Sequence, residues 1–314
     1  MSSGHSATGG WESFTVTVLP QNELTVSVEL GPAVVAGPLT RCITFELWNC
    51  TTGQKESIDQ ELSFTNGQSG MVTLLVPCAA GPFTCITARD RLHTLRQTAD
   101  AADGHFGIVD TRYVASFTGD PNSGGDWLWG GNLNDSPYVD ILDFGVFSWQ
   151  YGTVYGAGNT TCSTAYPHAD VNGDGIVNTA DFTFIQINFT RSSATDCCAG
   201  PGDPNEPGSP ITRISVTELN AVGLGELAAG DLNGDGWLDE LDMDLFAHSL
   251  PRPGDMNCDG VVSFVDINPF VLALTGRAAY EAQFSQCRWL NADANGDGMV
   301  NFADINPFVA LLAR

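Results

Sequence analysis

The sequence at residues 170–181 reads DVNGDGIVNTAD, and the same pattern recurs at residues 231–242, 255–266 and 293–304. In each copy, Asp or Asn occupies the first, third and fifth positions, glycine the sixth, an apolar residue the eighth and Asp the twelfth. A weaker copy, NLNDSPYVDILD, covers residues 132–143 and has Pro137 at the sixth position. This repetition indicates that one loop unit, used several times, organises the second part of the chain.

Alternating oxygen-bearing side chains in a twelve-residue loop are typical of a calcium site. Side-chain oxygens of positions 1, 3, 5, 9 and 12 and the carbonyl of position 7 surround the ion, and glycine at position 6 permits the sharp turn. Ca²⁺ accepts such irregular oxygen shells, whereas Mg²⁺ demands a tighter octahedron. The four good loops therefore predict Ca²⁺ as the cofactor, while the weaker loop leaves calcium and an ordinary polar turn equally open. The predicted ligands are Asp170, Asn172, Asp174, Ile176, Asn178, Asp181, Asp231, Asn233, Asp235, Trp237, Asp239, Asp242, Asp255, Asn257, Asp259, Val261, Ser263, Asp266, Asp293, Asn295, Asp297, Met299, Asn301 and Asp304.

Apolar residues with helical spacing follow the loops, such as Phe182 and Ile185 after the first one. After the loop at 255–266, Asn268-Pro269 fits a helix N-cap followed by proline at the first helical position. Ser215 and Glu218 fit a capping box ahead of the loop at 231–242. Since one short helix cannot bury its own apolar face, we expect the loop–helix units to pack in pairs.

These duplicated loops, each followed by one helix and closed by Asp rather than Glu, resemble dockerin modules, most closely at residues 170–189. The resemblance covers about residues 119–196 and 211–314. It implies paired calcium loops whose helices bind a protein partner, either a cohesin-like module or a second copy, in an extracellular polysaccharide-related system. Dockerins often contact cohesin through loop positions 10 and 11. Here these are Phe264-Val265 and Phe302-Ala303 in the last two loops, where we expect them to lie in the core.

Residues 1–118 contain short β-rich segments separated by Gly-Pro and Asn-Gly turns, and residues 25–30 alternate between polar and apolar side chains. About seven such strands favour an immunoglobulin-like β-sandwich. The predicted fold class is therefore multidomain, with an all-β sandwich followed by α-helical dockerin-like repeats that carry EF-hand-type loops. We expect the sandwich at 1–118, a loop pair at 119–199, a Pro/Gly linker at 200–210 and three further loops at 211–314. We also expect calcium removal to unfold the repeats while the sandwich stays folded.

The chain has a formal charge of −25, with 12 basic against 37 acidic residues, and Lys55 is its single lysine. Nucleic acids and anionic membranes both need clustered Lys and Arg. The composition therefore excludes these partners and favours cations as ligands. No apolar run in the sequence is long enough to span a membrane.

Nine cysteines predict several disulfides. Cys42 and Cys50 lie too far apart along one strand to pair with each other. The expected partners are Cys78 or Cys85 for each of these two, Cys197 or Cys198 for Cys162, and Cys287 for Cys258. Disulfides and millimolar calcium both indicate an extracellular protein. Residues 1–10 carry no signal-peptide pattern, and we expect the chain to be a piece of a longer secreted protein.

No catalytic motif stands out, because the five histidines are scattered and no nucleophile elbow or phosphate loop is present. We interpret the chain as a secreted, non-catalytic calcium-binding protein whose repeats mediate attachment or assembly. The alternative is a carbohydrate-binding module, or the C-terminal accessory part of a polysaccharide-degrading glycoside hydrolase. Trp127 and Trp129 are the candidate sugar platform, because they share one face of a strand; burial between sandwich and repeats is the competing explanation.

Overall fold

The computed structural model describes residues 21–77, 81–194, 197–198, 208–249, 253–259, 261–284, 287–295 and 299–313. Cys78, Asp297 and most of the expected linker at 200–210 lie outside the described residues. The chain divides into two compact units, Met1–Ile211 and Thr212–Arg314. The boundary therefore falls after the expected linker, and residue 118 does not separate compact units.

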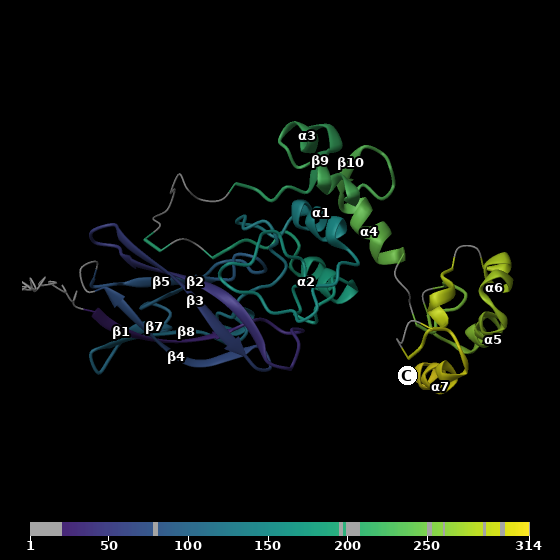
Figure 1. Cartoon of the computed structure of the whole chain (residues 1–314), viewed down its shortest axis with the longest axis horizontal. Coiled ribbons are helices and arrows are strands. Elements are labelled where there is room, and N and C mark those ends of the chain that lie inside the picture. Colours follow the sequence, from purple (N-terminus) through teal and green to yellow (C-terminus); the bar gives the residue numbers. More distant parts are fainter. Residues whose placement is uncertain are drawn as a thin grey trace, which may run out of the picture. The chain divides into compact units, whose positions relative to one another are not determined.

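Strands of the first unit form two four-stranded sheets (Figure 1). The first sheet has the order β4 (Gln68–Pro77), β1 (Gln21–Glu29), β8 (Arg112–Phe117) and β7 (Phe106–Val109). Within it, β1 runs antiparallel to β4 and parallel to β8. The second sheet has the order β3 (Gln54–Phe64), β2 (Leu39–Asn49), β5 (Cys85–Arg89) and β6 (Gln97–Asp100), all antiparallel.

Alternate residues of these strands point into one shared core, as the period of a strand requires. On β1, Leu24, Val26 and Val28 are fully buried. The rings of Phe45 on β2 and Phe117 on β8 lie 6.4 Å apart, so the core joins the two sheets. Together with the helices described below, these sheets give the chain a mixed α/β architecture.

Two helices of the first unit begin inside the repeated loops. Asp140, at position 9 of the weaker loop, caps α1 (Ile141–Gln150), and Asn178 at the same position caps α2 (Thr179–Asn188). Each cap forms a capping box with the Asp at position 12. Phe144 of α1 meets Phe182 of α2 with ring centroids 5.8 Å apart. The first two loop–helix units therefore pack as a pair.

The second unit begins with a short hairpin of β9 (Arg213–Ser215) and β10 (Trp237–Asp239) that encloses α3 (Val216–Ala221) and a 3-10 helix, η3 (Gly225–Gly230). The predicted capping box of Ser215 and Glu218 is confirmed at the start of α3. The remaining helices are α4 (Glu240–Ser249), α5 (Ile267–Thr275), α6 (Arg277–Gln283) and α7 (Ile305–Leu312), with short 3-10 turns η4 (Phe264–Asp266), η5 (Trp289–Ala292) and η6 (Phe302–Asp304).

The last two loop–helix units pack through equivalent residues. The rings of Phe270 on α5 and Phe308 on α7 stack with centroids 3.9 Å apart. The prediction that Asn268 caps α5 is wrong, because a 3-10 turn precedes the helix. Ser263 caps that turn through a capping box with Asp266, and Asn268-Pro269 falls inside the helix.

Three disulfides join the sheets of the first unit to its later segments, namely Cys42–Cys162, Cys50–Cys198 and Cys85–Cys197. The expectations that pairing stays within the strands, and that Cys162 pairs with Cys197 or Cys198, are therefore wrong. Residues 160–162 and 197–198 return to the second sheet, where the Thr160 N–H donates to the Thr40 carbonyl at 2.9 Å. The predicted pair Cys258–Cys287 is confirmed.

The described helices include none that is long and apolar enough to cross a membrane.

Digestion of the oxidised protein without reduction, followed by mass spectrometry, tests this pairing. We expect peptides of β2 and β5 to be linked to peptides of residues 162–198, because these cysteines have Cα–Cα distances of 4.9, 5.0 and 5.7 Å. Peptides that link Cys42 or Cys50 to Cys85 would contradict the fold of this unit.

Candidate metal-binding site

The loop at 170–181 is held closed by its own carboxylates. The two oxygens of Asp170 accept the N–H groups of Gly173 and Gly175, each at 2.9 Å. Gly175 has φ +90°, and a Cβ there would lie 1.7 Å from the Gly156 carbonyl oxygen. Glycine at position 6 is thus required both by the turn and by the neighbouring backbone.

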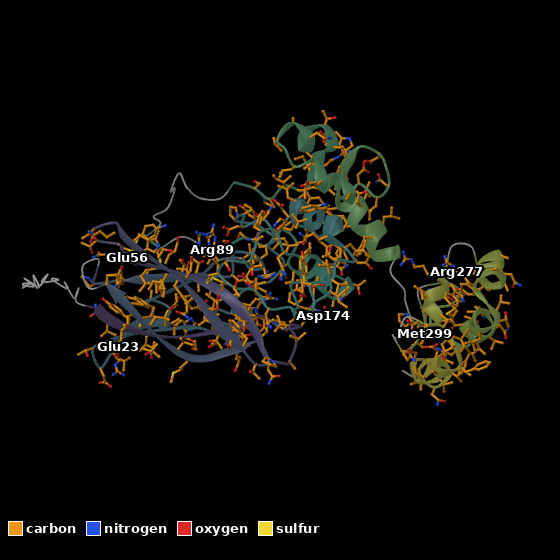
Figure 2. The ribbon with its side chains drawn as sticks, viewed as in Figure 1. Glu23, Glu56, Arg89, Asp174, Arg277 and Met299 are labelled. Atoms are coloured by element: carbon orange, nitrogen blue, oxygen red, sulfur yellow. A yellow bond between two sulfur atoms is a disulfide. The ribbon has the colours of Figure 1, made fainter. Side chains whose placement is uncertain are left out.

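The predicted ligand groups of this loop converge on one point. The Asn178 amide nitrogen lies 3.0 Å from the Ile176 carbonyl oxygen and 3.0 Å from Asp174 Oδ2. Asn172 Nδ2 donates to the same Asp174 oxygen at 2.9 Å. Figure 2 shows Asp174 in its place on the ribbon. Positions 3, 5, 7 and 9 therefore lie next to one another, with the amide nitrogens of Asn172 and Asn178 donating to Asp174 Oδ2.

The Asp at position 12 is buried in all five loops. In the first good loop, Asp181 accepts the N–H groups of Asn172 and Asn178, each at 2.9 Å. The same carboxylate-to-backbone pattern recurs at the other four positions, and all five side chains are fully buried: Asp143, Asp181, Asp242, Asp266 and Asp304. Among the residues that the structure describes, no basic side chain forms an ion pair with any of the five.

Burial of these carboxylates has an electrostatic cost. Burial raises the pKa of the Asp181 carboxyl to about 6. The charge of Asp170 adds to this increase, whereas the hydrogen bonds from the N–H groups of Asn172 and Asn178 oppose it. Burial likewise raises the pKa values of Asp143 and Asp242. A buried anion that lacks a cationic partner is unfavourable. The residues present therefore fit a divalent cation with oxygen ligands.

The later loops repeat this geometry with local differences. Asn257 Nδ2 donates to Asp259 Oδ2 at 2.9 Å, as in the first loop, whereas the corresponding distance from Asn233 to Asp235 is 3.4 Å. Asp239, the predicted ligand at position 9, also lies 3.2 Å from the Arg213 guanidinium. In the loop at 293–304, the described residues include the buried Asp304, which accepts the Asn301 N–H at 2.8 Å.

In the weaker loop, Asn132 and Ser136 occupy positions 1 and 5, which carboxylates hold in the good loops. Asn132 Nδ2 donates to the Ser136 carbonyl at 2.7 Å, and its Oδ1 is buried without a hydrogen-bond partner. Asp140 accepts the N–H of Ile211 at 3.0 Å in addition to that of Leu142. At positions 1, 3 and 5 this loop therefore has two fewer carboxylates than each good loop.

Arg41 connects the second sheet to the loop at 170–181. Its side chain is the largest among the fully buried ones of the described residues. Its Nη2 donates to the carbonyls of Asp170 and Val171, at 3.0 and 3.1 Å, and its Nε lies 3.8 Å from Asp90 Oδ2. Burial lowers the pKa of Arg41, and the charges of Asp90, Asp170 and Asp181 oppose that effect. A strand residue thus fixes positions 1 and 2 of the loop from the side of the sheet.

Two histidines extend this buried cluster. His93 Nδ1 lies 2.7 Å from Asp90 Oδ2, and its Nε2 lies 3.1 Å from His168 Nδ1. Burial lowers the pKa of His168 to about 3, so the ring is neutral at pH 7. His93 and His168 are 1% and 5% exposed, so the pair is inaccessible to a substrate and serves to hold the sheet and the loop together. Sequence reasoning missed this cluster, because nothing local links His93 to a residue 75 positions later.

A second cluster that the sequence did not reveal consists of Asp103, His105 and Asp126. Their candidate ligand atoms lie within 4.8 Å of one another, and His105 Nδ1 contacts Asp126 directly. Burial raises the pKa of Asp126, and the bond to His105 opposes it. Since His105 and Asp126 already satisfy each other, this arrangement does not identify a metal.

Two aromatic features have different surroundings from those expected. Trp129 is buried beneath the Arg191 guanidinium, 3.8 Å from its ring centre, and the Trp127 ring stands at 86° to it. The two rings therefore form no common platform.

Phe264 and Phe302 are 79% and 78% exposed, so the expectation that these loop pairs lie in the core is wrong.

No protein-family model matches this chain, and no curated protein matches it.

The Arg41 cluster gives a prediction about stability. We expect Arg41→Met to lower the free energy of unfolding by about 3–5 kcal/mol, because it leaves the buried Asp90 carboxylate and the loop carbonyls without their donor. Urea unfolding followed by tryptophan fluorescence measures the change.

Arg112→Met is the matched control. Arg112 pairs with Glu23 at an exposed position, so its loss should cost less than about 1 kcal/mol. Equal effects of the two substitutions would show that Arg41 does not join the sheet to the loop.

Proposed function

We propose that this chain is an extracellular, non-catalytic calcium-binding protein whose repeated loops fold around Ca²⁺ and serve to attach it to a protein partner. The observation that carries the proposal is the fully buried Asp at position 12 of each loop, which accepts backbone N–H groups and forms no ion pair with a basic side chain among the described residues. The resemblance to dockerin modules and the disulfides support the extracellular, polysaccharide-related setting.

Calcium suits these loops better than other common ions. Carboxylate, amide and carbonyl oxygens are hard ligands, which excludes a preference for soft or imidazole-binding metals. The Asn side chains and backbone carbonyls make the loops adaptable in geometry, which Ca²⁺ tolerates and Mg²⁺ does not. We assign one ion to each of the four good loops. Each ion would stabilise its unit by about 2.7 kcal/mol at a free concentration one hundred times its Kd.

Calcium titration tests the assignment loop by loop. We expect isothermal titration of the metal-free protein to give four calcium ions per chain, and Asp174→Ala to reduce this count by one, because Asp174 accepts from both amides at the centre of its loop. Mg²⁺ at equal concentration should not replace calcium.

Asp120→Ala is the control, since Asp120 caps a 3-10 turn outside the loops. It should leave the count unchanged. An Asp174→Ala protein that still binds as many calcium ions as the parent would refute the first site.

The exposed apolar residues of the last two loops support attachment to a partner. Phe264 and Phe302 occupy position 10 of two loops of the same pattern, and both are exposed. On the helices that follow, Val271 and Val309 are also exposed at equivalent positions. Exposed apolar groups of this kind mark interaction surfaces. We infer that the partner is a cohesin-like module or a second copy of this chain, and that it covers this surface when calcium orders the loops.

The double substitution Phe264→Ser/Phe302→Ser tests this surface. We expect it to abolish calcium-dependent association, measured as a change of mass in light scattering for self-association and by co-purification with a cohesin-like module for a heterologous partner. The loss follows from removing the two largest exposed rings of the pair.

Met71→Ser serves as the control, because Met71 is equally exposed but lies on β4 of the other unit. It should leave association intact. Association that persists in the double variant would place the contact elsewhere on the chain.

A further inference from the structure

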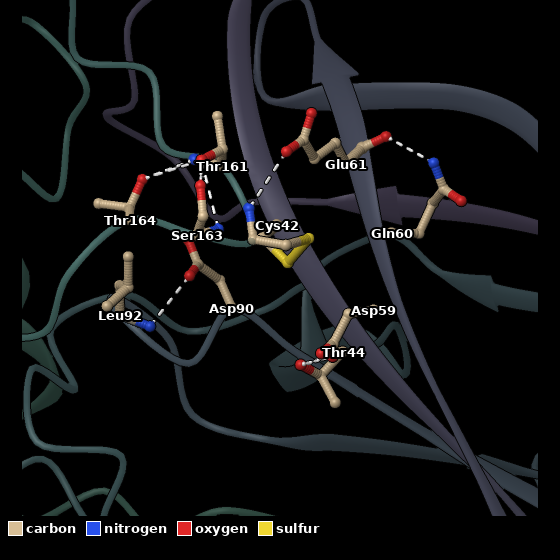
Figure 3. Close-up of a disulfide and its surroundings, with 11 residues drawn as sticks. Cys42, Thr44, Asp59, Gln60, Glu61, Asp90, Leu92, Thr161, Ser163 and Thr164 are labelled. Atoms are coloured by element: carbon tan, nitrogen blue, oxygen red, sulfur yellow. Dashed lines mark hydrogen bonds between the residues drawn. A yellow bond between two sulfur atoms is a disulfide. The ribbon is translucent and has the colours of Figure 1, made fainter.

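A hollow of about 420 Å³ opens over the second sheet of the first unit. Its walls come from β2 and β3, the turn after β5, and residues 134–135 and 161–166. The disulfide Cys42–Cys162 forms part of the wall and ties the strand to the covering turn (Figure 3). This volume lies within the range of about 300–1,000 Å³ that is common for small-molecule sites. The hollow is separate from the calcium loop at 170–181 and from Trp127 and Trp129.

Hydrogen-bonding groups face the hollow from both walls. Thr44 Oγ1 donates to Asp59 Oδ1 at 2.7 Å across the paired strands, which leaves Asp59 Oδ2 as an acceptor. The opposite wall carries the hydroxyl groups of Thr161 and Thr164, which lie 3.4 Å apart (Figure 3). The site therefore offers a charged acceptor and several hydroxyl groups in a rigid frame.

Two of the three carboxylates that line the hollow are paired with guanidinium groups. Asp90 lies beside Arg41, and the two carboxylate oxygens of Asp135 lie 3.0 Å from Arg89 and 3.1 Å from Arg91.

The third carboxylate, Asp59, accepts the Thr44 hydroxyl, and Glu61 on the same face of β3 accepts the Cys162 N–H at 3.2 Å. These two acidic groups disfavour an anionic ligand and can accept hydrogen bonds from the hydroxyl groups of a neutral one.

Tyr166 supplies an aromatic surface at the edge of the hollow. It lines the hollow and is 53% exposed, so its ring is available for contact. A neutral molecule with many hydroxyl groups and an apolar ring face is a sugar, and such faces pack against aromatic rings. We propose that this hollow binds a neutral sugar unit, with Asp59 and Thr164 hydrogen-bonded to its hydroxyl groups and Tyr166 packed on its ring.

Saturation-transfer NMR and calorimetric titration of the full chain test the proposal, with cellobiose, xylobiose, maltose and lactose as neutral probes and digalacturonate as an anionic one. We expect saturable binding of at least one neutral probe with a Kd of about 1 mM or tighter. Asp59→Ala and Tyr166→Ala should each weaken it by about ten-fold or more, since each removes a main contact.

Matched controls separate the site from general effects. Ser57→Ala changes the same face of β3 outside the hollow, and Tyr151→Ala removes an exposed tyrosine elsewhere. Both should bind like the parent, and binding should persist in variants that lose a calcium ion from the second unit. Binding of none of the neutral probes, binding of digalacturonate alone, or binding unaffected by Asp59→Ala and Tyr166→Ala would overturn the proposal.

Discussion

The buried guanidinium of Arg41 is the contact on which the first unit depends. Arg41 lies on β2 of the second sheet, and its guanidinium donates to carbonyls at the start of the loop at 170–181. Asp90 balances its charge, and His93 and His168 complete the cluster with neutral rings. Removing any one partner would leave a buried polar group unpaired, which is costly in a low-dielectric interior. Sheet and loop are therefore parts of one folded unit.

This connection changes what calcium is expected to do. If the loops were separate modules, removing the ion would unfold them and leave the sheets intact. Because Arg41 and three disulfides join the first loop to the sheets, loss of the proposed calcium ion should also weaken the strands. The buried Asp181 then affects the core indirectly. Its carboxylate accepts N–H groups of the loop backbone, and Arg41 donates to carbonyls of the same loop.

The sequence predicts what is local and misses what is distant. The loops are recognisable within twelve consecutive residues, and the capping boxes of Asp181 and Asp266 form within the same short stretches. The calcium-ligand role of these residues stays a prediction. The disulfides of the first unit span more than a hundred residues each, and no local pattern selects one partner over another. Phe264 was expected in the core because it is apolar, but the 3-10 turn η4 leaves it on the surface. The hollow beside Asp59 likewise forms because residues 161–166 lie against the second sheet, which no local sequence pattern predicts.

Hydrogen–deuterium exchange with and without calcium tests the central claim most directly, which is that the first loop and the second sheet respond to calcium together. We predict that chelation accelerates amide exchange in residues 170–181 and, in the same step, in β2 around Arg41. Exchange that accelerates in the loop while β2 keeps its full protection would contradict the account, as would a loop whose exchange does not depend on calcium.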